Sequence, residues 1–174
     1  MPQTFQEGRV EFEFPDTWVV LRPEKATYYK RHFQSFAGGC KEMDFLLFDP
    51  GSKVLWLFEV KDYTTSPRIK TQSVFDEVAK KARDSLALLY AGSARDNAMP
   101  PHVGNFARQT WVPAKIRIVL HLEQPTKPSK LFSGVKIAAD ASHALRTKVK
   151  AVDPHALVTS CSSKMDSWSA KWKP

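Results

Sequence analysis

The sequence of 174 residues contains only two cysteines, Cys40 and Cys161, which lie far apart and outside any CxxC or Cys/His pattern. This spacing predicts neither a disulfide framework nor a structural metal site, and it favours a reducing compartment. The longest apolar runs have about five residues, as at residues 54–58, whereas a membrane span needs roughly 18. The N-terminus lacks the basic region and apolar core of a signal peptide. We therefore expect a cytoplasmic protein with no membrane partner.

Several common functional motifs are also missing from the sequence. It contains no P-loop, no dinucleotide-binding fingerprint, no HExxH motif, no internal repeat and no low-complexity tract. The five histidines are scattered without ligand spacing, so we interpret them as structural or surface residues. With 43% hydrophobic and 25% charged residues, the composition is that of an ordinary globular chain. We expect residues 1–174 to form a single domain with a basic C-terminal extension at about residues 160–174.

Positive charge is concentrated in the last third of the chain. The formal net charge is +8; residues 1–112 carry 15 basic and 14 acidic side chains, and residues 113–174 carry 11 basic and 4 acidic ones. Clustered positive charge attracts polyanions through phosphate neutralisation and release of counterions. The pattern favours a nucleic acid as partner, with a merely solubilising face as the alternative.

Hydrophobic periodicity and turn residues divide the chain into strands and helices. The expected strands cover residues 11–14, 18–21, 43–48, 53–61, 115–122 and 156–159. The expected helices cover residues 23–33, 73–91 and 138–151. In the helix at residues 73–91, Ser73 is the expected N-cap and Gly92 the residue that ends the helix. Residues 92–112 are expected to form a long loop. Because strands 43–48 and 53–61 are apolar on both faces, we expect them to form a central hairpin with helices on at least one side. The predicted fold class is α/β, a central mixed β-sheet flanked by helices.

Charged residues stand at one end of this hairpin. Glu59 and Lys61 share a strand face with Leu57, and burying them is costly unless they are paired or bind a metal. If the turn is residues 49–52, Phe48 pairs with Lys53, which places Asp44 opposite Leu57 and diagonal to Glu59. The register therefore predicts that Asp44, Glu59 and Lys61 gather at one end of the hairpin.

These three residues suit phosphodiester hydrolysis. Two neighbouring carboxylates can bind a hard divalent cation such as Mg²⁺, which polarises a phosphoryl oxygen. A nearby lysine can orient or deprotonate the attacking water and stabilise developing negative charge. The alternative interpretation is a solvated Glu59–Lys61 pair at the end of a sheet, with Asp44 capping a turn.

Asp44, fourteen intervening residues and then Glu59-Val60-Lys61 resemble the D-(x)n-ExK signature of the PD-(D/E)xK nuclease superfamily. The resemblance covers roughly residues 24–122 and implies the restriction-endonuclease-like fold, with an αβββαβ core. It also implies that Asp44 and Glu59 ligate Mg²⁺ (or Mn²⁺), together with the Val60 carbonyl and, in some members, an acidic residue of the first helix, here Glu24. Lys61 would be the catalytic lysine. Met43 departs from the pattern, because a proline often precedes the aspartate in the family.

The resemblance further implies an endonuclease or exonuclease, for which we favour DNA over RNA as the substrate. It also implies a role in a bacterial defence or repair system, with a protein partner or as a homodimer. We expect Tyr63, Arg68, Lys70 and Gln72 to contact the nucleic acid, since they follow the active end of the strand. One alternative is a non-catalytic subunit that keeps the nuclease fold and binds nucleic acid or protein. Another is an RNA-binding or assembly protein that depends on Trp168, Trp172 and the lysines around them.

Overall fold

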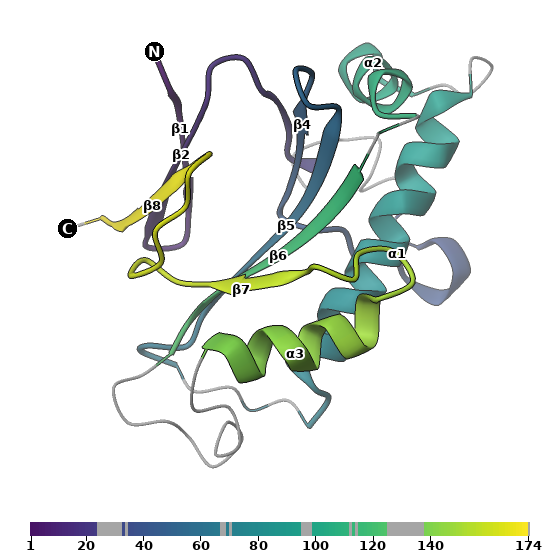
Figure 1. Ribbon diagram of the computed structural model, residues 1–174. Helices are drawn as coiled ribbons and strands as arrows, with labels where there is room; N and C mark the ends of the chain where they lie inside the picture. Colours follow the sequence, from purple (N-terminus) through teal and green to yellow (C-terminus); the bar gives the residue numbers. More distant parts are fainter. Residues whose placement is uncertain are drawn as a thin grey trace.

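The larger of two β-sheets forms the centre of the molecule (Figure 1). A computed structural model describes residues 1–23, 33, 35–66, 69, 71–94, 99–111, 113, 115–124 and 138–173. The larger sheet has the strand order β3-β4-β5-β6-β7, formed by β3 (Val19–Leu21), β4 (Phe45–Asp49), β5 (Val54–Asp62), β6 (Lys115–Glu123) and β7 (Leu157–Thr159). Strands β3, β4 and β5 are antiparallel, whereas β6 is parallel to β5 and β7 is parallel to β6. The sheet is therefore mixed, as predicted.

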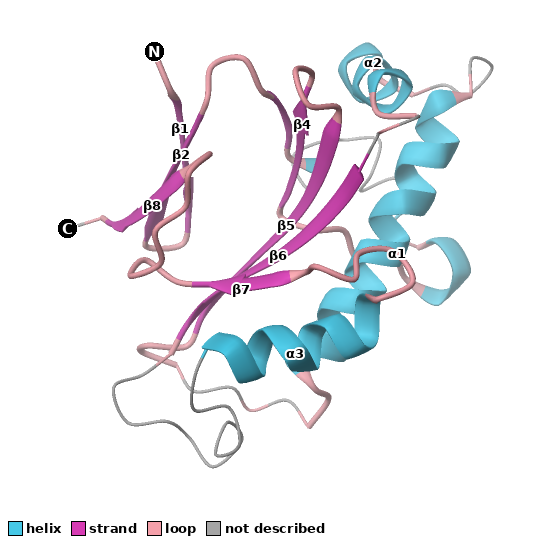
Figure 2. Ribbon diagram, viewed as in Figure 1, coloured by secondary structure: helices cyan, strands magenta, loops and turns pink. Residues whose placement is uncertain are grey.

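Helices cover one face of this sheet (Figure 2). They are α1 (Val74–Ser93), α2 (Pro101–Gln109) and α3 (Ala138–Val149), and a short 3-10 helix, η3 (Phe36–Gly38), precedes β4. Alternate residues of the central strands, such as Leu57 and Leu120, are buried against the helices in one core. Ser73 caps α1 as predicted, because its hydroxyl accepts a hydrogen bond from the Phe75 amide at 3.2 Å.

A smaller sheet covers the opposite face. Its strands are β1 (Gln3–Glu7), β2 (Val10–Phe14) and β8 (Ser169–Trp172), in the order β1-β2-β8. Its apolar side chains meet the other set of alternate residues from β4, β5 and β6, and this second core is rich in aromatic rings. Both chain termini lie on this side of the molecule (Figure 1). Among the described residues, no helix is both long and apolar enough to cross a membrane.

The hairpin of β4 and β5 forms as predicted, but its register is shifted by two residues. The loop is residues 50–53, so Asp49 pairs with Val54 and Phe48 with Leu55, not with Lys53. Lys53 adopts a φ of 53°, and the Asp49 carboxylate accepts hydrogen bonds from the Gly51 and Ser52 amides. The side chain of Asp49 thus holds the loop one residue later than expected. A shift of two keeps each side chain on its predicted face.

Two further expectations for the helical region are wrong. Gly92 does not end α1, which continues to Ser93; a β-carbon at Gly92 would lie 3.0 Å from that of Ala107, so glycine permits close contact between α1 and α2. The predicted loop of residues 92–112 contains α2, which starts with Pro101 in the first turn, a favourable position for proline. Most of the helix predicted at residues 23–33 lies outside the described residues.

Candidate functional site

Asp44 lies just before β4, and α1 fixes this segment in place. The Lys41 amide donates a hydrogen bond to Asp84 Oδ2 at 3.0 Å, and the Met43 amide donates one to Ser85 Oγ at 2.9 Å. The Asp44 carboxylate in turn accepts a hydrogen bond from the Val60 amide at 2.7 Å. These contacts direct Asp44 across the hairpin toward β5.

Glu59 is completely buried at the centre of the site. Continuing the hairpin register by one residue places Asp44 directly opposite Glu59, closer than the diagonal arrangement predicted from the sequence. Glu59 Oε1 accepts hydrogen bonds from Lys81 Nζ at 2.6 Å and forms an ion pair with Lys61 Nζ at 2.7 Å. Oε2 is buried and has no hydrogen-bond partner among the described residues. Burial and the nearby Asp44 charge raise the pKa of Glu59 to about 7, although the two lysines oppose this shift.

Two lysines connect the carboxylates. Lys61 Nζ lies 2.7 Å from Glu59 Oε1 and 2.9 Å from Glu77 Oε1, and Lys81 Nζ lies 2.6 Å from Glu59 Oε1 and 3.5 Å from Asp44 Oδ1. Burial disfavours both ammonium groups, but the carboxylates around them outweigh it and raise the pKa of each lysine. Both lysines are therefore positively charged at neutral pH.

We refer to Asp44, Glu59, Lys61, Glu77 and Lys81 as the carboxylate–lysine cluster. Among the described residues, the buried Oε2 of Glu59 has no hydrogen-bond partner, so this oxygen is available to hold a cation. An all-oxygen donor set from Asp44 and Glu59 fits Mg²⁺ or Mn²⁺.

A surface groove of about 440 Å³ borders the cluster on the side of α1. Its lining combines four basic side chains, two acidic side chains and two uncharged residues, and both Lys81 and Glu77 belong to the cluster. The lining residues are Lys41, Lys80, Lys81, Arg83, Glu77, Asp84, Gly39 and Gln72. A phosphate backbone is the kind of ligand that such a basic lining attracts.

The structure brings Asp44, Glu59 and Lys61 together, with Val60 next to them in β5. Gln72 lines the groove beside the cluster, whereas Tyr63 is partly buried and packs against the helical core. Glu24, Arg68 and Lys70 lie outside the described residues.

Sequence reasoning missed Glu77 and Lys81, which complete the cluster from α1. The sequence does contain a signal for these two residues. Glu77 and Lys81 are one helical turn apart, and each directly precedes an apolar residue of the buried stripe, Val78 or Ala82. They therefore border the buried stripe of α1.

A second group of potential metal ligands lies on the opposite face of the larger sheet. His121, Glu123 and Cys161 each offer one ligand atom, and these atoms all lie within 4.8 Å of one another. The sequence showed no ligand pattern because two residues come from β6 and the third follows β7. We call this group the His–Glu–Cys cluster.

Comparison with known proteins gives one partial likeness. No family model matches the chain, and no solved structure matches it. The cysteine–tRNA ligase of Neisseria meningitidis serogroup A is 29% identical to the chain over 176 residues, which cover 84% of this chain and 24% of the ligase. The chain thus spans about a quarter of this relative's length. The likeness does not assign the ligase activity to the chain.

Proposed function

We propose that the protein hydrolyses phosphodiester bonds in nucleic acid with Mg²⁺ or Mn²⁺ held by Asp44 and Glu59. The observation that carries this proposal is the buried, unpartnered Oε2 of Glu59 beside a second carboxylate and two lysines. This residue set also agrees with the resemblance to PD-(D/E)xK nucleases. The metal would polarise the scissile phosphate and increase the acidity of a water molecule.

In this proposal the acidic residues hold the cation and the basic residues act on the water and the phosphate. Asp44 and Glu59 bind the cation, with the Val60 carbonyl as the further ligand implied by the resemblance. Lys61 acts as an ammonium group because its two carboxylate neighbours raise its pKa, so it orients water and stabilises negative charge on the phosphate. This role replaces the removal of a proton from water, the other role considered for Lys61.

Lys81 extends the site toward the substrate. Its ammonium group contacts both Asp44 and Glu59, and the same residue lines the basic groove. If a divalent cation were held by the two carboxylates, the Lys81 ammonium group could donate to a phosphate oxygen. Glu77 keeps Lys61 in position from the opposite side.

The restriction-endonuclease-like fold is part of the proposal. An antiparallel β3-β4-β5 meander followed by α1 and by β6, parallel to β5, supports it. One difference from the αβββαβ order is that β3 precedes the helix expected at residues 23–33. Residues 24–32, which would show this helix, lie outside the described part of the chain.

DNA is the proposed substrate, as the resemblance implies, and the basic groove provides the matching charge. RNA belongs in the same tests because the partial likeness is to a tRNA ligase. A role in a bacterial defence or repair system, with a partner protein or as a homodimer, remains a proposal that rests on the resemblance.

Cleavage assays with variants at Asp44 and Lys61 test the proposal. The wild-type protein is incubated with Mn²⁺ and with single- and double-stranded DNA and RNA. We expect Asp44→Asn, which removes a charged metal ligand, and Lys61→Ala, which removes the ammonium group at the phosphate, each to lower the cleavage rate by about 10²-fold or more. Lys148→Ala, on the surface of α3, should retain the rate. Wild-type cleavage no greater than that of Lys61→Ala on every substrate would contradict the proposal.

A non-catalytic subunit is the second candidate function, and one observation favours it. Lys81 already bridges Asp44 and Glu59, so the cluster can act as a structural ion network without a metal. This alternative predicts salt-dependent binding to nucleic acid that persists in Asp44→Asn, with no cleavage by the wild-type protein.

A further inference from the structure

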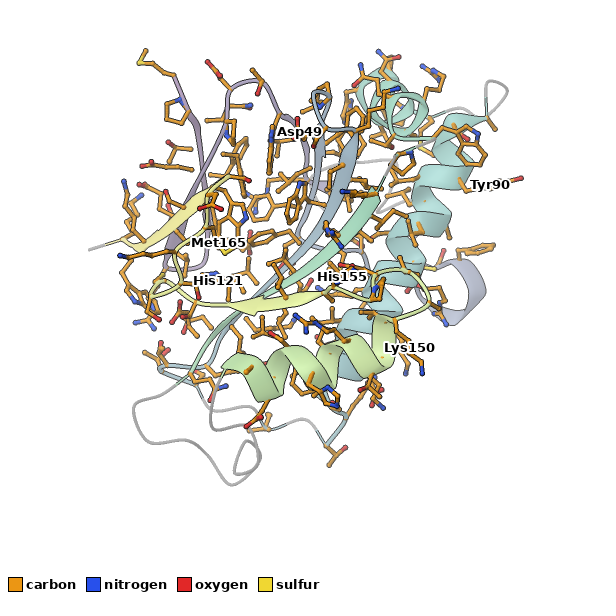
Figure 3. All side chains as sticks on the ribbon, in the orientation of Figure 1. Asp49, Tyr90, His121, Lys150, His155 and Met165 are labelled. Atoms are coloured by element: carbon orange, nitrogen blue, oxygen red, sulfur yellow. The ribbon has the colours of Figure 1, made fainter. Side chains whose placement is uncertain are left out.

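The His–Glu–Cys cluster is separate from the proposed nuclease site. His121 and Glu123 alternate along β6 and share the face that also carries Val119, which packs against the smaller sheet. The ring of His121 lies 4.9 Å from that of Phe12 in β2. Figure 3 shows His121 on the side of the larger sheet away from α1, whereas the carboxylate–lysine cluster faces α1.

The distances between potential ligand atoms in this cluster suit a small metal ion. His121 Nε2 lies 3.0 Å from Glu123 Oε1 and 3.8 Å from Cys161 Sγ. On tetrahedral zinc, with Zn–N of about 2.0 Å and Zn–S of about 2.3 Å, ligand atoms lie roughly 3.3 to 3.6 Å apart. The two separations from His121 Nε2 differ from this range by only a few tenths of an ångström, and all three ligand atoms lie within 4.8 Å of one another.

Neighbouring groups already orient the imidazole and the segment after β7. Thr159 is the register partner of His121 in β7, and its hydroxyl lies 3.3 Å from His121 Nδ1. This contact leaves Nε2 directed toward Glu123 and Cys161, as in metal sites where an outer group holds the second ring nitrogen. The Cys161 amide also donates a hydrogen bond to Glu123 Oε1 at 2.5 Å, which fixes the cysteine next to the carboxylate.

Burial makes a cation favourable at this position. The His121 side chain is fully buried, and that of Glu123 is 10% exposed. Within the described part of the chain, the only ion-pair partner of Glu123 is this imidazole, and no lysine or arginine contacts the carboxylate. A buried carboxylate beside an imidazole and a thiol is stabilised by a metal that accepts nitrogen, oxygen and sulfur ligands.

We propose that His121 Nε2, the Glu123 carboxylate and Cys161 Sγ form a zinc site. Thiolate and imidazole ligands select Zn²⁺ over Mg²⁺, so this metal differs from the one proposed for Asp44 and Glu59. Binding releases the thiol proton to solvent, and three protein ligands leave one coordination position for water. The metal would join β6 to the segment that follows β7 and leads on to Trp168 and β8. This inference does not depend on the nuclease proposal.

Metal binding by the full-length protein tests this inference. Reduced protein is treated with a chelator to remove metal, supplied with ZnCl₂ and desalted, and the bound zinc is then measured by mass spectrometry. The affinity of the protein for zinc is measured by competition with a chromophoric chelator. We expect one zinc ion per chain, and binding at least tenfold weaker in Cys161→Ser. Thr159→Val should weaken binding by about 10- to 100-fold through the loss of the outer contact to His121.

Two matched variants show whether zinc binds at this cluster. Cys40→Ser removes the other cysteine, on the helical side, and Asp44→Asn alters the proposed Mg²⁺ site; both should bind zinc like the wild type. Absence of bound zinc, or equal affinity in Cys161→Ser, would overturn the inference.

If Cys161→Ser does not fold, Co²⁺ replaces zinc in the wild type and in Cys40→Ser. A thiolate-to-cobalt charge-transfer band in both then supports the site, and its absence from both rejects it.

Discussion

At the scale of single residues, Glu59 is the group whose chemistry depends most on the fold. Its side chain has no exposed surface, faces the Asp44 carboxylate and has one oxygen without a hydrogen-bond partner among the described residues. Lys61 and Lys81 neutralise part of the charge, but burial and Asp44 still raise the pKa of Glu59 to about 7. In the absence of metal, Glu59 therefore binds a proton more tightly in the folded protein than in the unfolded chain.

This raised pKa predicts how stability depends on pH. The contribution of Glu59 to the free energy of unfolding is fully present below pH 4.5 and is lost as the pH rises to about 7. Between these values, wild-type protein in chelator should lose up to about 1.4 kcal/mol per pH unit relative to Glu59→Gln, which cannot titrate. Urea unfolding of both proteins at a series of pH values measures the difference. Parallel curves over this range would show that the pKa of Glu59 is not raised.

At the scale of secondary structure, α1 organises the site. One side of the helix carries Glu77 and Lys81 into the cluster, and one turn later Asp84 and Ser85 hold the residues that precede Asp44. The helix thus supplies both charged partners and the contacts that fix the position of the first carboxylate.

Removing the Ser85 hydroxyl should affect both stability and the site. Ser85→Ala leaves the buried Met43 amide without its hydrogen-bond acceptor, which should lower the free energy of unfolding by about 1 to 3 kcal/mol. Loss of this contact should also displace the neighbouring Asp44 and thereby lower nuclease activity. Ser93→Ala, at the end of the same helix, is the matched control, since among the described residues its hydroxyl donates a hydrogen bond to the Tyr90 carbonyl of its own helix. Chemical denaturation and cleavage rates compare the two variants; equal effects would argue against this role of Ser85.

The elements were more predictable from sequence than their contacts. Hydrophobic periodicity identified α1 and the hairpin, and alternation placed Asp44, Glu59 and Lys61 on one face. The exact register depended on a loop conformation that Asp49 stabilises through its side chain, so the prediction was off by two residues. The spacing of Glu77 places it beside the buried stripe of α1, but only the packing of α1 on the sheet brings it to Lys61. The His–Glu–Cys cluster was missed for the same reason.

At the scale of the whole molecule, the C-terminal segment packs into the aromatic core between the two sheets. Residues 169–172 form β8 beside β2, and Trp168 is buried against Phe58, with ring centroids 4.9 Å apart. Lys171 forms ion pairs with Glu11 and Glu13 in β2, and Lys148 with Asp76 in α1. Part of the positive charge of the last third therefore neutralises acidic residues of the same chain, which reduces what is available to an external polyanion.

The two tryptophans of this segment should contribute very differently to stability. Trp168→Ala leaves a cavity between the sheets and should lower the free energy of unfolding by about 3 to 5 kcal/mol. Trp172 is 41% exposed and packs beneath Arg9, so Trp172→Ala should cost about 1 kcal/mol or less. Thermal and chemical unfolding measure both. A greater loss of stability in Trp172→Ala than in Trp168→Ala would contradict this assignment of the core.

The most direct test of the account is a crystal structure of the protein soaked in Mn²⁺, with the metal located by its anomalous scattering. We predict a peak between the carboxylates of Asp44 and Glu59, within coordination distance of Glu59 Oε2, and its absence from Asp44→Asn crystals soaked in the same way. A well-ordered site with no peak there, and with Lys81 still bridging Asp44 and Glu59, would contradict the claim that these carboxylates hold a catalytic metal.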